Sequence, residues 1–329
     1  MKQRVCLSAA LFALLFLPSC AKTNTAKPVF AFDTVFEQTV IGGEPILDLF
    51  SSDEAVFSRT LPASELYRLN EAGGGEASGE LLTLLTEAKN IAAASDGAFD
   101  FTLAPVSDLW NFTEAKLPEE TALADALTRT GYERVSINGT VDLGGTAVDL
   151  GGIAKGYEVG KLLALYREQN VKGALVSCSS SVGVIGTKAN GDAFQIGVRD
   201  PDGGLLGVLS LTDSILSTSG DYERCFTLDG VRYHHILDPD TGTPVQNGLR
   251  SVTVVAPLSD DLSLTGARTD ALSTALFVLG RGEKADALLR EYGMEAIFVT
   301  DDGIFLTAGL KENFSTDRAF TVLGKDGLS

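Results

Sequence analysis

The chain has 329 residues, of which 44% are hydrophobic and 21% charged, and this composition excludes a disordered or collagen-like protein. Its 44 acidic and 26 basic residues give a formal net charge of −18, which argues against binding nucleic acid through a broad basic surface. The two histidines, His234 and His235, are adjacent, so a metal site built from several separated histidines is excluded and any imidazole chemistry belongs to this pair.

The start of the chain has the pattern of a bacterial export signal. Lys2 and Arg4 precede an apolar run from Leu7 to Leu17, which is too short to span a bilayer as a helix. Leu17-Pro18-Ser19-Cys20 then resembles the bacterial lipobox, which implies cleavage before Cys20 and a lipid on its thiol. An ordinary signal peptide or an uncleaved anchor is the alternative interpretation.

The lipobox determines the organisation that we expect. Residues 1–19 would be a lipoprotein signal peptide, residues 20–30 a lipidated tether, and residues 31–329 one folded body, because no linker or repeat divides them. The protein would then be extracytoplasmic and lipid-anchored at the cell membrane. Cys178 and Cys225 could pair or remain separate thiols, and their spacing does not decide between these.

Along the body, helices and strands are predicted in an irregular order. Apolar residues at helical spacing, together with capping signals, predict helices at 81–92, 119–128, 154–168, 270–279 and 283–292. Short apolar runs bounded by turn residues predict strands at 173–176, 182–185, 194–198, 208–211, 251–256, 296–299 and 303–307. Strand meanders with intervening helices favour an α+β fold over a strictly alternating one.

Two polar segments come first among those that could carry chemistry. Residues 149–157 place three glycines around a switch from strand to helix, where backbone amides can approach a phosphate at a helix N-terminus. The same residues are equally consistent with an ordinary tight turn. Residues 217–224 crowd hydroxyls, an acid pair and a basic residue, and composition alone favours a polar hairpin there.

Two further segments carry a histidine pair and an oxygen pair. In a strand before the Asp-Pro-Asp-Thr-Gly turn, His234 and His235 would face opposite sides, so only one could enter a given site as a base. On a helix, Asp270 and Thr274 share one face, and an oxygen-only pair suits Mg²⁺ that keeps waters and phosphate oxygens as other ligands. The alternatives are a structural histidine and an N-cap Asp with a surface Thr.

The order of these segments along the chain resembles the ApbE family of FAD:protein FMN transferases. The most specific parts are Gly152-Ile153-Ala154-Lys155-Gly156, His235-Ile236-Leu237-Asp238-Pro239-Asp240-Thr241-Gly242 and Asp270-Ala271-Leu272-Ser273-Thr274. Segments 32–34, 64–70 and 95–105, with Leu109-Trp110, extend the resemblance over nearly the whole mature chain.

The resemblance implies a single-body, T-fold-like α+β architecture with an antiparallel sheet and flanking helices. It also implies a Mg²⁺-dependent reaction in which FAD is split, FMN is attached by a phosphoester bond to a Ser or Thr of an acceptor flavoprotein, and AMP leaves. Asp270, Thr274 and the backbone carbonyl of Ala154 would hold the metal, and His235 would be the base. The remaining implied residues lie at the flavin nucleotide: Phe32, Asn70, Ala98, Phe99, Asp100, Tyr157 and Ile236.

Two departures from the family pattern touch the expected nucleotide site. Ser179-Ser180-Ser181 replaces a Gly-Gly-Asn run, and Gly160 replaces a carboxylate, with Glu158 nearby instead. Two other functions therefore stay open beside the transferase. One is a Mg²⁺-dependent FAD pyrophosphatase, in which water replaces the protein hydroxyl, and the other is a lipoprotein that binds a flavin or another solute without turnover.

Overall fold

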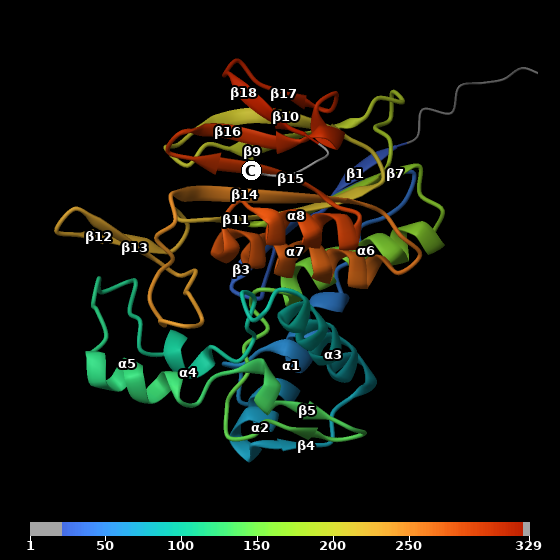
Figure 1. The fold of residues 1–329 in the computed structure, drawn as a ribbon. Coiled ribbons are helices and arrows are strands. Elements are labelled where there is room, and N and C mark those ends of the chain that lie inside the picture. The colour runs from blue at the N-terminus through green and yellow to red at the C-terminus, as the bar shows by residue number, and fades with distance from the viewer. Residues whose placement is uncertain (1–21, 325–329) are drawn as a thin grey trace, which may run out of the picture.

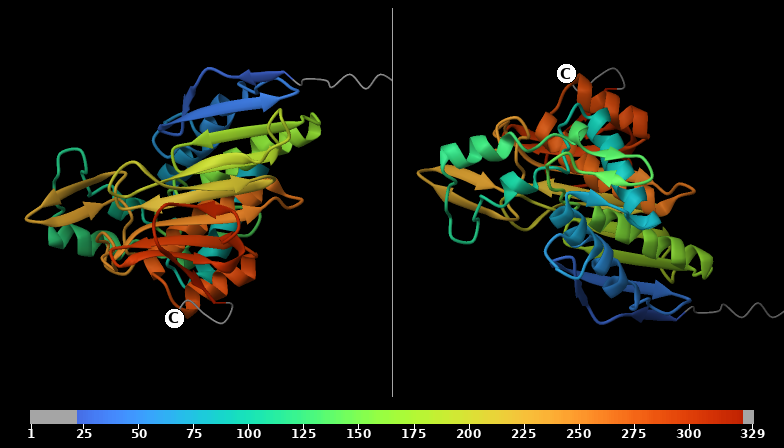
Figure 2. Two further views of the ribbon diagram at one scale, coloured as in Figure 1. Left: turned by 90° about the horizontal axis from the view of Figure 1, so that it is seen from above. Right: turned by 90° about the horizontal axis from the view of Figure 1, so that it is seen from below.

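The computed structural model describes residues 22–324, and a 10-stranded sheet runs through its middle (Figure 1). Its strands are β1 (Thr23–Thr25), β2 (Val29–Ala31), β3 (Thr34–Ile41), β7 (Gly173–Cys178), β8 (Ser181–Gly186), β11 (Ser214–Gly220), β14 (Leu249–Pro257), β15 (Glu295–Thr300), β16 (Gly303–Thr307) and β18 (Phe320–Leu323). The order is β1-β3-β7-β8-β11-β14-β15-β16-β18, with β2 also paired to β3. Seen from above, the colours pass from blue at one edge to red at the other (Figure 2). Every pair is antiparallel except β16 with β18, which confirms the antiparallel α+β fold.

Helices lie on one side of this sheet and a smaller sheet lies on the other (Figure 1). The helices are α1 (Leu49–Phe57), α2 (Glu65–Ala72), α3 (Gly79–Ala94), α4 (Ala104–Ser107), α5 (Glu120–Leu127), α6 (Ala154–Glu168), α7 (Leu262–Leu279) and α8 (Glu283–Tyr292), with short 3-10 turns at Tyr132–Arg134 and Ala308–Leu310. The smaller sheet consists of β9 (Phe194–Arg199), β10 (Leu205–Leu211) and β17 (Phe314–Ser315). Its buried residues, such as Ile196 and Leu209, form one apolar core with Val255 and Ile297 of the main sheet.

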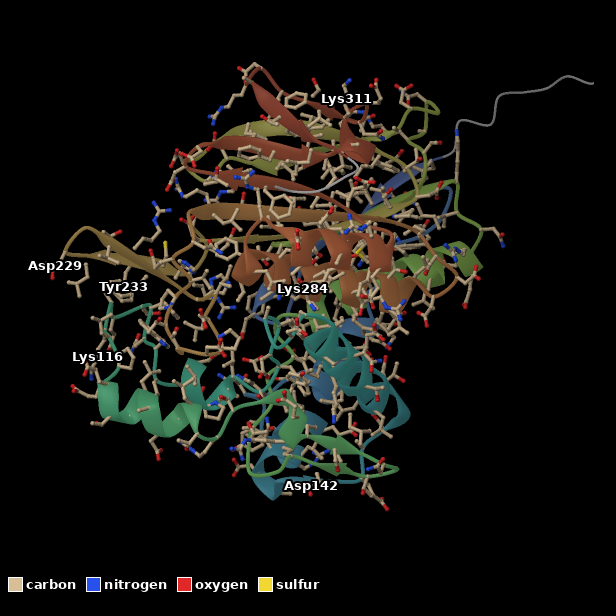
Figure 3. The ribbon with its side chains drawn as sticks, viewed as in Figure 1. Lys116, Asp142, Asp229, Tyr233, Lys284 and Lys311 are labelled. Atoms are coloured by element: carbon tan, nitrogen blue, oxygen red, sulfur yellow. The ribbon has the colours of Figure 1, made fainter. Side chains whose placement is uncertain are left out.

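Two further small sheets lie outside these layers. The strands β4 (Gly74–Gly75), β5 (Ser136–Ile137) and β6 (Val141–Asp142) brace the lower part of the body. The strands β12 (Cys225–Leu228) and β13 (Val231–His234) pair only with each other, and this hairpin projects from the body with Asp229 at its tip (Figure 3).

The helices α6 and α7 meet backbone to backbone through glycines. A Cβ atom added at Gly156 would overlap the carbonyl oxygen of Gly266, and one added at Gly160 would overlap that of Leu262. Only glycine allows this approach, because any side chain would have to displace the opposite backbone. The crossing brings the first turns of α6 against the middle of α7.

Most predicted elements are confirmed, and α6 and α8 have the predicted bounds. The αL conformation of Gly293, with φ of 63°, confirms it as the C-cap of α8. Two elements differ from the prediction. Helix α7 begins at Leu262, eight residues before the predicted start, and residues 217–220 belong to the central strand β11 instead of a polar hairpin.

The segment expected to be a tether is partly paired. Residues 23–25 form β1, which pairs with β3 between Thr23 and Ile41, and residues 29–31 form β2. These residues therefore belong to the folded body, because their backbones are hydrogen-bonded into its sheet. The predicted signal peptide, residues 1–19, and the lipidation site Cys20 lie outside the described residues. Within residues 22–324 no helix is long and apolar enough to cross a membrane.

Candidate active site

The carboxylate of Asp270 lies at the N-terminus of α6. Asp270 is in the middle of α7 and only 4% exposed, and its Oδ2 accepts a hydrogen bond from the backbone N–H of Gly156 at 3.0 Å. The N-cap residue of α6, Ile153, has no side chain that could accept this bond, so a carboxylate from another helix supplies the acceptor. Asp270 is therefore not the N-cap of its own helix, which is Asp261.

One turn further along α7, Thr274 faces the same region. Its Oγ1 lies 3.2 Å from Oγ of Ser219, which is also 2.9 Å from Oγ of Ser273. Gly152, two residues before Ala154, lies between Thr274 and the ring of Phe99: an added Cβ would be 3.8 Å from Thr274 Oγ1 and 3.2 Å from Phe99 Cε2. The predicted residues Asp270, Thr274 and Ala154 thus come together at the start of α6.

These oxygen atoms fit a divalent cation of the Mg²⁺ type. One carboxylate, one hydroxyl and the carbonyl of a helix start are hard donors, and a site with few protein ligands leaves positions for water and phosphate oxygens. Oδ1 of Asp270 accepts no hydrogen bond from residues 22–324, so it remains available as a donor. In the same range no group of three or more His, Cys, Asp or Glu side chains is arranged so that it could hold a metal ion.

The two histidines face different surroundings, as predicted from strand alternation. His234 is buried, with Nε2 2.9 Å from the carbonyl oxygen of Val245 and its ring edge-on to Phe277. Nδ1 of His235 is buried and has no hydrogen-bond partner among the described residues. His234 is thus the structural histidine, and His235 is the one whose ring nitrogen is free to act.

Burial, with the positive charge nearby, keeps the imidazole of His235 neutral. Burial, followed by the positive charge of Arg224, the neighbouring His234 and then Lys155, lowers the pKa of His235 to about 3. The same Lys155 also lies close to the oxygen donors, since its Nζ is 3.9 Å from Oδ2 of Asp270. The site therefore combines a neutral base, a cation and a buried carboxylate at the first turn of α6.

Two residues predicted at the nucleotide, Asn70 and Asp100, make hydrogen bonds within the protein. The side-chain amide of Asn70 donates to the carbonyl oxygen of Val148 at 2.9 Å and accepts from the N–H of Val148 at 2.8 Å. Oδ1 of Asp100 accepts from the backbone and the hydroxyl of Thr102 at 2.7 and 2.6 Å, and its Oδ2 accepts from the N–H of Tyr132 at 3.2 Å. Both side chains therefore position the loops around the site, because their polar atoms are already bonded within the protein.

The other predicted nucleotide residues lie in three separate segments. Phe99 and Ala98 are nearly buried, and Phe99 touches Gly152 at the start of the Gly-rich loop. Phe32 is half-buried at a positive φ of 52°, in the two-residue turn between β2 and β3. Ile236 is buried directly after His235, and its carbonyl oxygen accepts from Val245.

Tyr157 lies beside a group of three acidic residues, Asp53, Glu80 and Glu158, of which Asp53 and Glu158 are buried. Its ring packs edge-on against Phe57, and its hydroxyl lies 3.3 Å from Oε1 of Glu80. Lys161 Nζ bridges Glu80 and Oδ2 of Asp53, the latter at 2.6 Å. Glu158 is fully buried beside them, and neither of its oxygens has a hydrogen-bond partner among the described residues. Burial and then the neighbouring carboxyl of Asp53 raise the pKa of Glu158, so it is held in the neutral form.

The two departures from the family pattern have different structural roles. Gly160 lies at the crossing of α6 and α7, where no side chain fits, so a carboxylate there is incompatible with this packing. Ser181 is buried and its Oγ lies 2.8 Å from Oγ of Ser217, while Oγ of Ser180 is buried without a partner among the described residues. Ser181 is therefore structural.

Ser219, whose hydroxyl contacts both Ser273 and Thr274, is not singled out by the sequence pattern. Its segment contains Ser-Thr-Ser-Gly, which is typical of turns and predicts a polar hairpin. In the strand β11, Ser217 and Ser219 point to the helix side, whereas Thr218 points away and contacts Oγ1 of Thr253 at 2.8 Å. The alternation of hydroxyls along the run was the signal that could have revealed it.

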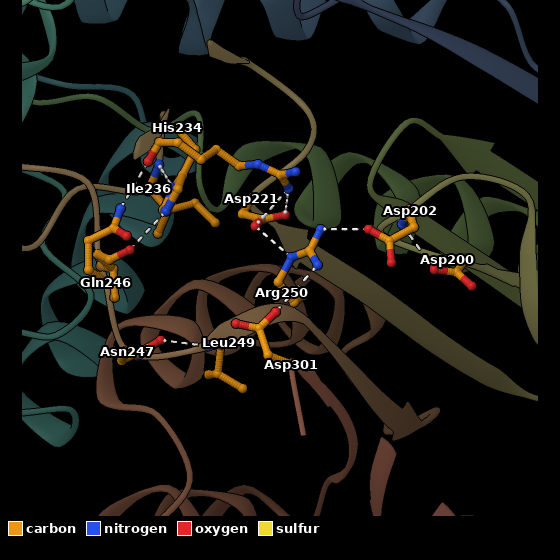
Figure 4. Close-up of polar contacts among 12 residues, drawn as sticks. Asp200, Asp202, Asp221, His234, Ile236, Gln246, Asn247, Leu249, Arg250 and Asp301 are labelled. Atoms are coloured by element: carbon orange, nitrogen blue, oxygen red, sulfur yellow. Dashed lines mark hydrogen bonds and ion pairs between the residues drawn. The ribbon is translucent and has the colours of Figure 1, made fainter. Parts of the chain in front are cut away.

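Near this site, an ion-pair network fixes the base of the β12–β13 hairpin (Figure 4). Both oxygens of Asp221 accept from Arg232 on β13 at 2.9 Å, and Oδ2 also accepts from Arg250 on β14 at 2.9 Å. Arg250 further contacts Asp202 at 3.1 Å and Asp301 at 3.5 Å. These three residues line an open hollow of about 300 Å³, but none of the predicted site residues does. The candidate active site is therefore the region of α6 and α7 where Asp270 and Thr274 lie.

The remaining cysteines are both free thiols in the structure. Cys178 is buried in β7 and Cys225 is half-buried in β12. Burial raises the pKa of the Cys178 thiol to about 12, so it is protonated at neutral pH. Cys178 therefore lacks the character of a reactive nucleophile.

Known proteins resemble this chain in sequence and in fold. A model of the ApbE family matches residues 32–298. An FAD:protein FMN transferase of Treponema pallidum is 37% identical over 289 residues, covering 79% of this chain and 77% of its own, and one of Salmonella typhimurium is 26% identical, covering 95% and 96%. The crystal structure of an ApbE protein from Thermotoga maritima has a TM-score of 0.77 at 31% identity, covering 89% of this chain and 99% of its own. The apo flavinyl transferase ApbE of Pseudomonas stutzeri has a TM-score of 0.75 at 27% identity, covering 91% and 98%.

Proposed function

This chain belongs to the ApbE family, and from that premise we propose that it is an FAD:protein FMN transferase. The substrates are FAD and a Ser or Thr hydroxyl of an acceptor flavoprotein. The hydroxyl oxygen attacks the phosphorus that carries the riboflavin part, the bond from that phosphorus to the AMP oxygen breaks, and AMP leaves. The observation that carries this proposal is the meeting of Asp270 and Thr274 with the start of α6, beside the unpartnered Nδ1 of His235.

We propose that Mg²⁺ is held by Asp270, Thr274 and the carbonyl of Ala154. When bound, the ion offsets the negative charge of the pyrophosphate and of the departing phosphate. Ser219 supports this set, because its hydroxyl contacts Thr274 and fixes the threonine rotamer. Lys155 adds a positive charge 3.9 Å from Asp270, at the same end of α6.

His235 would accept the proton of the attacking hydroxyl. With its pKa lowered to about 3, the imidazole is neutral throughout the physiological range and has a lone pair to offer. The negative charge of a bound pyrophosphate would raise this pKa, because an anion nearby favours the imidazolium form. Substrate binding would therefore strengthen the base at the moment when the acceptor hydroxyl arrives.

We also propose that the protein is extracytoplasmic and attached to the membrane by a lipid on Cys20. The support for this part is the sequence pattern of residues 1–20.

The test is an acceptor-labelling assay. Purified protein is incubated with FAD, MgCl₂ and a flavoprotein domain carrying a Ser or Thr flavinylation site, with EDTA as the metal-free control. We expect a fluorescent covalent flavoprotein and equimolar AMP, both abolished by EDTA and strongly reduced in His235→Gln. No labelling of several acceptors despite bound FAD would refute the proposal. FMN and AMP formed without acceptor would instead indicate a pyrophosphatase, and intact FAD after long incubation a binding protein.

A further inference from the structure

The β12–β13 hairpin connects the reactive histidine to an exposed surface. The register pairs Phe226 with Tyr233 and Leu228 with Val231, so these four side chains share one face of the hairpin. Strand β13 ends one residue before His235. Because side chains alternate along a strand, Val231 and Tyr233 point to the same face, and His235 follows directly after the strand. The hairpin therefore leads from its tip to the base of the proposed reaction.

The face is covered near the body and open near the tip. Phe226 stacks on Tyr233 with ring centroids 5.2 Å apart and lies 6.1 Å from the ring of Phe112. Leu228 and Val231, in contrast, are 40% and 43% exposed. Figure 3 shows Tyr233 between the hairpin tip at Asp229 and the body. The apolar face of the hairpin thus extends beyond Phe226 and Tyr233 to Leu228 and Val231, which are partly exposed to solvent.

The hydrogen-bonding pattern leaves one edge of the hairpin free. The turn residues Asp229 and Gly230 have φ of 49° and 81°, as in a type I′ turn, so Leu228 and Val231 form the hydrogen-bonded closing pair. In an antiparallel ladder the next pair then directs its backbone groups outward. The N–H and C=O of Thr227 therefore point away from β13.

The opposite edge, along β13, is already engaged. The carbonyl oxygen of Arg232, opposite Thr227, accepts from Nε2 of Gln246 at 3.0 Å, and the guanidinium of Arg232 is held by Asp221. Along β12, no hydrogen bond from another segment of residues 22–324 reaches Thr227 or Cys225. An unpaired strand edge is a template for pairing with another extended chain.

We infer that the outer edge of β12 binds an extended segment of the acceptor flavoprotein by strand addition and so guides its hydroxyl residue to His235. This inference rests on the proposed function. The ladder continues to the histidine, since the N–H of His235 donates to the carbonyl oxygen of Arg224 at 3.1 Å. A strand added to β12 would run about 10 Å from β13, two strand spacings, so the hydroxyl residue would lie in the part of the segment that continues past the added strand and turns toward His235. Leu228 and Val231 would contact apolar side chains of that segment.

The experiment compares two substitutions at Thr227. Thr227→Pro removes the outward N–H without removing a bond of the hairpin ladder, because that N–H is not used within it. Thr227→Ala is the matched control, since it changes the side chain but keeps the N–H. A second variant, Leu228→Thr with Val231→Thr, alters the exposed face while keeping residues that favour strands. Each protein is assayed for FAD binding, for KM of the acceptor and for kcat at saturating acceptor.

We expect Thr227→Pro to raise the acceptor KM about tenfold, as for the loss of a backbone hydrogen bond, with FAD binding and kcat unchanged. The double variant should raise the same KM, and Thr227→Ala should not. An acceptor KM equal in Thr227→Pro, the double variant and wild type would overturn the inference. So would a change of oligomeric state in Thr227→Pro with the KM unchanged, because the edge would then pair with a second copy. If wild-type protein labels no acceptor, the proposed function itself has failed.

Discussion

Oδ2 of Asp270 accepts the backbone N–H of Gly156 at 3.0 Å, so a carboxylate from the middle of α7 closes the N-terminus of α6. The bond has two consequences. It satisfies a helix N–H that has no partner within its own helix, and it fixes the carboxylate where the remaining oxygen can meet a cation. Stability and activity therefore depend on different properties of the same side chain.

The charge and the hydrogen bond of Asp270 can be separated by two substitutions. Asp270→Asn keeps an oxygen that can accept from Gly156 but removes the negative charge, so transfer should fall by about two orders of magnitude while the melting temperature changes little. Asp270→Ala also leaves the N–H of Gly156 without its acceptor and should lose about 1–3 kcal/mol of unfolding free energy. Acceptor labelling and urea denaturation measure the two effects. Equal transfer by Asp270→Asn and wild type would contradict the metal assignment.

Ser219 should act on the metal through Thr274. In Ser219→Ala the threonine loses its 3.2 Å contact, so its hydroxyl can rotate away and the Mg²⁺ concentration for half-maximal transfer should rise several-fold. The matched control is Thr218→Val, on the opposite face of β11, where the hydroxyl contacts Thr253. Titration of transfer against Mg²⁺ distinguishes the two positions, and an equal Mg²⁺ requirement in both variants would argue against this role.

The contact of α6 and α7 through glycines predicts that adding one methyl group, as in Gly160→Ala, strongly lowers the stability of the protein. In Gly160→Ala the new Cβ would overlap the carbonyl oxygen of Leu262, and the strain should cost about 1–3 kcal/mol or more, beyond the gain in helix propensity. Gly79→Ala is the control, because no atom lies within 4 Å of its added Cβ at the start of α3. Thermal unfolding should show a lower midpoint for Gly160→Ala and an equal or higher one for Gly79→Ala.

The lowered pKa of His235 makes a prediction about stability at acid pH. Between the unfolded value near 6.5 and about 3, the unfolded chain binds a proton at this position and the folded chain does not. The free energy of unfolding therefore decreases as the pH falls through this window, because the buried position next to Arg224, His234 and Lys155 disfavours the protonated form of His235. His235→Gln should be less destabilised than wild type between pH 6.5 and pH 4. Parallel curves of unfolding free energy against pH would contradict the assignment.

Glu158 predicts the opposite dependence on pH. Its folded pKa is raised, mainly by burial and then by Asp53, so the folded chain keeps a proton that the unfolded chain releases above about pH 4.5. Glu158 thus lowers stability increasingly as the pH rises above that value. Glu158→Gln should be more stable than wild type at pH 8, and by a smaller margin at pH 5. Glu168→Gln, exposed on the same helix, should show no such difference.

The sequence could predict the elements whose residues face one apolar side. In α8, Ala285, Leu288 and Leu289 form a buried face at helical spacing, and Gly293 ends the helix in the αL conformation. The first half of α7 could not be found in this way. Thr265, Gly266 and Ala267 are all buried although two of them are small and one is polar, because α7 is enclosed on several sides.

The sequence suggested candidate site residues where their chemistry is unusual. Asp270 and Thr274 could be paired by their spacing on one helix, the scarcity of histidines left the pair His234 and His235, and the family resemblance pointed to His235. Asn70 and Asp100 match the family pattern equally well, but their polar atoms bond to Val148, Thr102 and Tyr132. Such long-range backbone contacts leave no local pattern in the sequence. Ser219 differs, because its signal was the alternation of hydroxyls along β11, which a turn-like composition obscures.

The contact of α6 and α7 through glycine also determines how stiff the site is. Side chains between helices normally absorb small displacements by changing rotamer, whereas peptide groups in direct contact have no rotamers to change. The start of α6 and the Asp270 turn of α7 must therefore move as one unit under thermal motion. Backbone contact between the two helices sets the distance between the oxygen donors that they carry. Because no side chain lies between the helices at Gly156 and Gly160, we expect this distance to vary little.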